Sequence, residues 1–153
     1  METSPLQLDA YFIDEITAKV NTAFDPTTQE YLGQLTVSPQ HLIRTDDGDH
    51  HQLVLTVTYL PQEGSEASLP YYVEITARGF YHWEGADLDD DQRNRMLALN
   101  GSSILYGLMR AEVAQVTALG QHGTMLLPTV NLLEAFAAQE GDSQSSGATG
   151  LDQ

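Results

Sequence analysis

Cysteine is absent from this chain of 153 residues. Its absence removes disulfides, thiol nucleophiles and thiolate metal sites, and it suits a reducing compartment. No apolar run approaches the ~20 residues that span a bilayer. The first five residues, Met-Glu-Thr-Ser-Pro, lack the positive and apolar regions of a signal peptide. We therefore expect a cytoplasmic protein without membrane insertion.

Basic residues are scarce. Six Lys and Arg stand against 22 Asp and Glu, which gives a formal net charge of −16 at pH 7. Such a field repels phosphate backbones, so nucleic acid and anionic membrane surfaces are poor partners and basic proteins are favoured ones. An acidic chain that is simply well solvated remains open on composition alone.

Four stretches alternate between apolar and polar residues and predict β-strands: 11–24, 33–44, 51–60 and 69–83. The third should bury Leu53, Leu55, Val57 and Tyr59, and the fourth Tyr71, Val73, Ile75 and Ala77. In the first, one side should carry Phe12, Ile16, Ala18, Val20 and Phe24, with Asp14 interrupting. Pro39 in the second stretch indicates an edge strand or a bulge.

The connections between the later strands are too short for parallel crossovers. Residues 46–49, Asp-Asp-Gly-Asp, have hairpin chemistry because Asp-Gly tolerates positive φ. Residues 61–68 form a longer polar loop. The sheet should therefore be antiparallel, with a meander in its second half.

Beyond Trp83 the pattern becomes helical. After an acidic connector, a short helix should run through Leu99 and end at Asn100-Gly101. A longer helix over 103–119, capped by Ser102 or Ser103 and ended by Gly120, should follow. Residues 121–130 should be extended. We thus predict an α+β fold in one domain, 1–139, with a last helix over 131–139 and a disordered polar tail, 140–153.

The helix over 103–119 carries more apolar surface than one small sheet needs. Its large apolar residues spread over about half of the circumference, whereas a helix on a sheet needs a stripe only a little over ~100° wide. A second copy of the chain would most simply cover the surplus, although a helix set deeper in a monomeric core remains open. The predicted oligomer interface comprises Ile104, Leu105, Leu108, Met109 and Val116.

The sequence gives little support for a metal site. His50 and His51 lie beside three aspartates, but adjacent side chains on a strand point to opposite faces. The acidic run from Asp87 resembles a calcium loop, yet Gln92 and Ala98 replace its glycine and its glutamate. We predict no metal and no cofactor.

Catalytic motifs are also missing, since no phosphate-binding loop, nucleophile elbow or His-Glu-x-x-His sequence occurs. His82 beside Glu84 has the composition of a general-base pair, but such strand neighbours are more often surface partners. The chain is therefore not expected to be an enzyme.

Residues 103–136 resemble the SecB family of protein-export chaperones. Ile104-Leu105-Tyr106, Arg110, Gly120 and Val130-Asn131 stand at the family's spacing, and the order of strands, helices and acidic tail is similar. Gly107 replaces a family proline, and Ala111 replaces the glutamate that follows the arginine. The chain is thus identified as a diverged member.

The resemblance implies an ATP-independent holdase that binds unfolded or precursor polypeptides for protein export through the SecA motor. It also implies a dimer of dimers and a client groove between the sheet and the last helix. For each groove residue, plain core packing is the alternative. The groove residues implied by matching position are Leu35, Val37, Phe80, Tyr81, Leu132 and Phe136.

SecA docks on acidic residues of the family's outer sheet face, and Glu15 and Glu74 match two of them. A third acidic position is Lys19 here, which weakens the case for docking. A dedicated chaperone of one partner, such as an antitoxin, and a non-enzymatic structural adaptor therefore remain alternatives.

Overall fold

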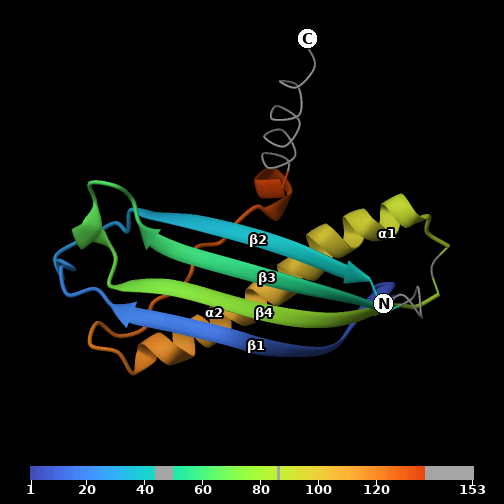
Figure 1. Ribbon diagram of the computed structural model, residues 1–153, viewed down its shortest axis with the longest axis horizontal. Helices are drawn as coiled ribbons and strands as arrows, with labels where there is room; N and C mark the ends of the chain where they lie inside the picture. The colour runs from blue at the N-terminus through green and yellow to red at the C-terminus, as the bar shows by residue number, and fades with distance from the viewer. Residues whose placement is uncertain (44–49, 86, 137–153) are drawn as a thin grey trace, which may run out of the picture.

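The computed structural model describes residues 1–43, 50–85 and 87–136. Its framework is one four-stranded antiparallel sheet in the order β1-β4-β3-β2 (Figure 1). The strands are β1 (Leu6–Val20), β2 (Gly33–Ile43), β3 (His50–Pro61) and β4 (Tyr71–Trp83). The predicted antiparallel sheet is confirmed, and the predicted hairpin at 46–49 lies outside the described residues.

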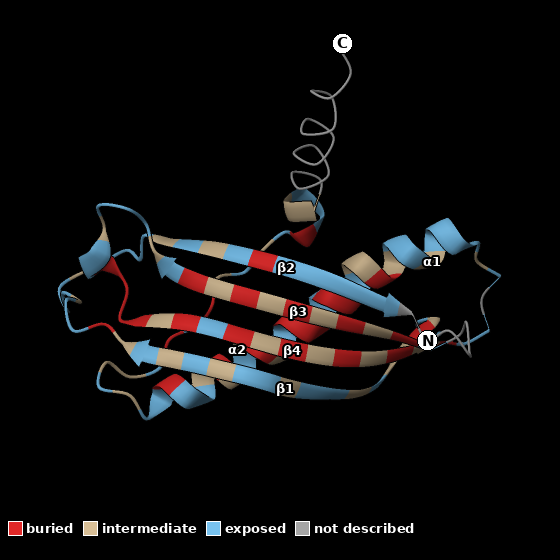
Figure 2. Cartoon of the chain, in the orientation of Figure 1, coloured by how far each residue is buried: buried red, intermediate tan, exposed pale blue. Residues whose placement is uncertain are grey.

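The two central strands follow the predicted alternation. On β3 and β4 every second side chain is buried, which Figure 2 shows as red bands. Leu55, Val57, Val73, Ile75 and Ala77 are each 0% exposed and form the centre of the core. Both strands have a neighbouring strand on each side, so each residue faces either the core or the outer surface. The alternation of apolar and polar residues predicts the buried face correctly.

β1 departs from its prediction in bounds and in phase. It begins five residues earlier than expected, at Leu6, and ends at Val20, so Phe24 lies beyond it. Its pairing with β4 is irregular between Leu8 and Ala10 and between Ile13 and Glu15. Each bulge inserts a residue and reverses the faces of those that follow. The prediction that Phe12 shares a face with Ile16 is therefore wrong.

β2 is an edge strand, as Pro39 indicated, because it pairs only with β3 within the described sheet. Its inner face contributes Leu35 and Val37, which pair with Tyr59 and Val57 of β3.

The helical half is one continuous run in three parts: α1 (Asp90–Met96), a π-helical turn η2 (Leu97–Gly101) and α2 (Ser102–Ala118). Asp89 caps α1 in a capping box with Gln92. α2 crosses the inner face of the sheet and contacts β4, β1 and β3 (Figure 1). No helix within the described residues is long and apolar enough to cross a membrane.

The predicted helix end at Asn100-Gly101 is wrong, and so is the predicted cap at Ser102 or Ser103. Gly101 keeps helical angles, with φ −61° and ψ −44°. The Tyr81 hydroxyl donates to its carbonyl at 2.6 Å, which satisfies an acceptor at the π turn. A Cβ on Gly101 would lie 3.2 Å from Leu97, so this glycine serves close packing and not chain reversal.

Beyond α2 the chain returns without regular structure, and residues 132–136 are helical. The predicted last helix is thus present from residue 132. Its remaining residues and the predicted tail, 140–153, lie outside the described residues.

Candidate functional site

The apolar residues of α2 divide into a buried set and an exposed set. Leu105, Met109 and Val113 are each 0% exposed and face the sheet. Ile104 and Val116 are each 41% exposed. In this conformation Leu105 and Met109 belong to the core of the single chain and have no surface for a partner. Of the predicted interface residues, Ile104, Leu108 and Val116 remain exposed or partly exposed and could contact a partner.

The predicted groove residues of β2 and the last helix lie against the same core. Val37 and Leu132 are buried, whereas Leu35 and Phe136 are half-buried and pack against the core cluster. More apolar surface is open nearby in sequence, since Leu126 and Leu133 are 60% and 61% exposed. The client-binding role of these positions stays a prediction.

Phe80 and Tyr81 point to opposite faces of β4 and cannot line one groove. Phe80 lies on the outer face, where its ring meets Phe12 edge to face at 6.0 Å between centroids. Tyr81 is 1% exposed on the inner face, and burial raises the pKa of its hydroxyl above the ordinary range. Only Phe80 offers surface, and that surface is on the side away from α2.

Glu15 and Glu74 lie on the outer face and are exposed, as their predicted docking role requires. Glu74 pairs with Thr17 of β1. Glu15 and Lys19 flank Thr17 on the same face, so each is a diagonal neighbour of Glu74. The structure therefore brings both glutamates together and places the lysine beside them.

The two bulges of β1 each present an aspartate to a basic residue of β4. Asp14 forms an ion pair with Arg78 at 3.0 Å, and Asp9 contacts Nδ1 of His82 at 2.6 Å. The other ring nitrogen of His82 lies 3.0 Å from Glu84. The surface contact between His82 and Glu84 agrees with the sequence. Asp9 was missed because the predicted strand began at residue 11, whereas β1 begins at Leu6.

Hydrogen bonding to Glu84, and then to Asp9, raises the pKa of His82 above its ordinary 6.5. A raised pKa in the folded state stabilises the fold below the unfolded value, and the gain disappears as pH rises through the folded value. We expect wild type to exceed His82→Gln in free energy of unfolding at pH 6 and below, and to match it in mildly alkaline buffer. Urea denaturation across this window measures the difference, and a gap that does not vary with pH would contradict it.

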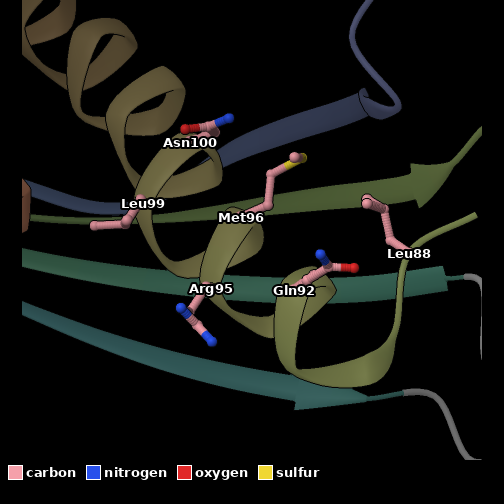
Figure 3. Close-up of a pocket in the computed structure, with 6 residues that line it drawn as sticks. All are labelled: Leu88, Gln92, Arg95, Met96, Leu99 and Asn100. Carbon is pink, nitrogen blue, oxygen red and sulfur yellow. The ribbon is translucent and has the colours of Figure 1, made fainter. Parts of the chain in front are cut away.

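A shallow hollow of about 320 Å³ lies on α1 and the π turn (Figure 3). Apolar and amide groups with one guanidinium line it, without a carboxylate pair or a nucleophile. Its lining residues are Leu88, Gln92, Arg95, Met96, Leu99 and Asn100. Within the described parts of the chain, no three His, Asp or Glu side chains gather to hold a metal ion.

No family model matches the chain, but individual proteins do. It is 24% identical over 139 residues to the protein-export protein SecB of Psychrobacter cryohalolentis, with 91% of this chain and 89% of that protein covered. For SecB of Psychrobacter arcticus the identity is 23% over 142 residues, covering 93% of each. For SecB of Alcanivorax borkumensis it is 24% over 143 residues, covering 93% and 89%.

A solved structure has a similar fold. It is a SecB-like chaperone of Mycobacterium tuberculosis in complex with an antitoxin peptide, with a TM-score of 0.62 at 13% identity. The match covers 83% of this chain and 91% of that one. The chain is thus similar to SecB proteins along nearly its whole length, at low identity, and it shares the fold of a SecB-like chaperone.

Proposed function

We propose that the chain is an ATP-independent holdase that binds unfolded or precursor polypeptides, primarily for protein export. The observation that carries the proposal is similarity over nearly the full length to three proteins named as protein-export SecB. Proteins of that name are chaperones, and we accordingly propose binding without catalysis.

The surface chemistry supports this function. Large apolar side chains remain exposed after α2: Leu119 at its end is 93% exposed, Leu126 on the return segment 60% and Leu133 in the last helix 61%. Such side chains can hold apolar segments of a client by burial alone, which requires no nucleotide. The net charge of −16 keeps the protein soluble and attracts basic segments of a client.

The test is an aggregation assay with a slowly refolding, non-native polypeptide. Purified protein at a stoichiometric ratio should delay light scattering by the client, without ATP. The folded form of the same client should not bind. Unaltered aggregation across a tenfold excess of the protein would refute the holdase function.

A dedicated chaperone for one partner is the second candidate. It is favoured by the similar fold of the SecB-like chaperone solved with an antitoxin peptide, and by Lys19 on the outer face. In that case one peptide should bind far more tightly than unrelated unfolded chains. A structural adaptor, the third candidate, would instead be isolated with its apolar surface permanently occupied by one protein.

We further propose a cytoplasmic dimer of dimers, in which the exposed apolar residues of α2 lie between copies. Ile104, Leu108 and Val116 would be buried there. An apolar arc that the sheet covers only in part supports this assembly.

We propose that the chain binds SecA weakly, because Lys19 reduces the negative field around Glu15 and Glu74. We expect binding weaker than that of a standard SecB, and weaker still as salt rises, since screening shortens the field to ~8 Å at physiological ionic strength. Titration of the SecA C-terminal tail should show that Glu15→Lys with Glu74→Lys abolishes binding.

Glu2→Lys with Glu30→Lys is the matched control, because it changes the net charge equally at two exposed positions outside the outer face. Equal binding by wild type and the Glu15/Glu74 variant would remove these glutamates from the docking role. Absence of binding by wild type would favour the dedicated chaperone.

A further inference from the structure

Residues 124–128, which we call the strap, run back along α2 without belonging to a helix or strand. Burial alternates along the strap: Met125 and Leu127 are 1% and 0% exposed, whereas Leu126 between them is 60% exposed. Polar backbone groups of buried residues need hydrogen-bond partners. No ladder supplies them here, and side chains serve instead.

Three side chains on one side of α2 are those partners, and we call them the α2 rail. Oγ1 of Thr117 accepts a hydrogen bond from the N–H of Met125 at 2.9 Å. Nε of Arg110 donates to the carbonyl of Leu127 at 2.9 Å. The hydroxyl of Tyr106 donates to the carbonyl of Pro128. Residues 106, 110 and 117 are spaced by four and seven, so they share a helix face.

The turn that leads into the strap is fixed separately. The hydroxyl of Tyr71 accepts a hydrogen bond from the N–H of His122 at 3.0 Å and donates to the carbonyl of Gly123 at 2.8 Å. The His122 ring packs against Phe24 at 4.9 Å between centroids. The strap is thus held at its start by β4 and along its length by the rail.

The rail decides which strap residues are buried. In an extended segment, a shift by one residue exchanges the buried and the exposed set. Such a slip would turn Met125 and Leu127 outward, and it would displace Leu132, which packs in the core only four residues beyond Pro128.

We propose that the α2 rail sets the register of the strap and thereby holds Leu132 and Phe136 in the geometry that binds client polypeptides. Tyr106, Arg110 and Thr117 are then positioning residues, which act on the client through the strap and not by contact. This inference rests on the proposed holdase function.

The central experiment compares Arg110→Met with Arg110→Lys and with Arg95→Met. Arg110→Met removes the donor to Leu127 and keeps an unbranched side chain. We expect amides 124–127 to exchange roughly three- to tenfold faster, the equivalent of one net hydrogen bond. Client affinity should fall by a similar factor. Arg110→Lys should restore part of both. Arg95→Met changes the charge equally at the open hollow and should alter neither.

Thr117→Val provides a test without a change of charge. It is close in shape and removes the acceptor of the Met125 N–H, so exchange at that amide should rise and client affinity should fall with it. Exchange within Leu105–Val113 should stay at the wild-type rate, which separates a loosened strap from a destabilised fold.

Either of two results would overturn the positioning role. Client affinity could fall in Arg110→Met while strap protection is unchanged, which would mean that the guanidinium meets the client itself. Amide exchange in the strap could rise in both Arg110→Met and Thr117→Val without any loss of client affinity, which would mean that the register of the strap does not affect client binding. A wild type that binds no unfolded polypeptide would instead refute the proposed function and, with it, the positioning role.

Discussion

Replacing Val116 by Asp should convert the proposed assembly into smaller species that retain the wild-type fold. Val116 is 41% exposed in the single chain, so a carboxylate there remains hydrated when the chain is alone. In the assembly the same carboxylate would be buried without a partner, at a cost of several kcal/mol. Because closed assemblies repeat their contacts, this cost recurs at each copy.

Light scattering gives the mass of the species, and circular dichroism reports whether the helices persist. Gln121→Asp is the control, since it adds a negative charge at an exposed position just after α2. A wild-type mass equal to one chain would refute the assembly outright. If the mass of Val116→Asp equals that of wild type, the interface does not include this part of α2.

Phe136→Ala should weaken client binding by roughly 1–3 kcal/mol, the range of an aromatic anchor residue. Phe136 is half-buried beside the core, so part of its ring is available to a client. Binding is measured by titrating a labelled unfolded polypeptide into the protein.

Phe12→Ala is the matched control. It removes the same side chain from an outer-face position that is 57% exposed, so client affinity should stay close to wild type. If Phe136→Ala instead lowers the free energy of unfolding while the folded fraction binds clients normally, Phe136 is only a core residue.

The sequence predicted the sheet well where one strand has neighbours on both sides. In β3 and β4 the period of two identified the buried set because both strands are regular and central. β1 lies at an edge and contains two bulges, whose positions no local pattern specified. Asp14, which interrupts the apolar side, lies at the second bulge, but one polar residue in an alternation does not identify a bulge. Because the predicted strand contained no bulge, the prediction placed Phe12 on the wrong face.

The π turn was hidden for a different reason. Asn100-Gly101 has the composition of a helix end, and only tertiary contacts reveal another role. The Tyr81 hydroxyl and the Leu97 side chain lie against Gly101, and both depend on how the helix sits on the sheet. A local preference was thus overridden by packing.

The α2 rail was missed because its partners are backbone atoms. Tyr106 and Arg110 were identified only as positions that match the SecB family. The apolar arc of the helix, from which an interface was predicted, does not include them. The usable signal was their spacing with Thr117: three hydrogen-bonding side chains on one helix face, followed by an extended stretch. Such a pattern indicates side chains that serve neighbouring backbone.

Both edges of the sheet are poor templates for added strands. β1 is bent by its two bulges, and β2 contains Pro39, which has no N–H to offer. A protein that handles aggregation-prone chains risks seeding a cross-β stack if it exposes a flat, regular edge. With these edges, a client held as we propose would be bound through its side chains and could dissociate without breaking a ladder of backbone hydrogen bonds. The chaperone itself would not nucleate fibres.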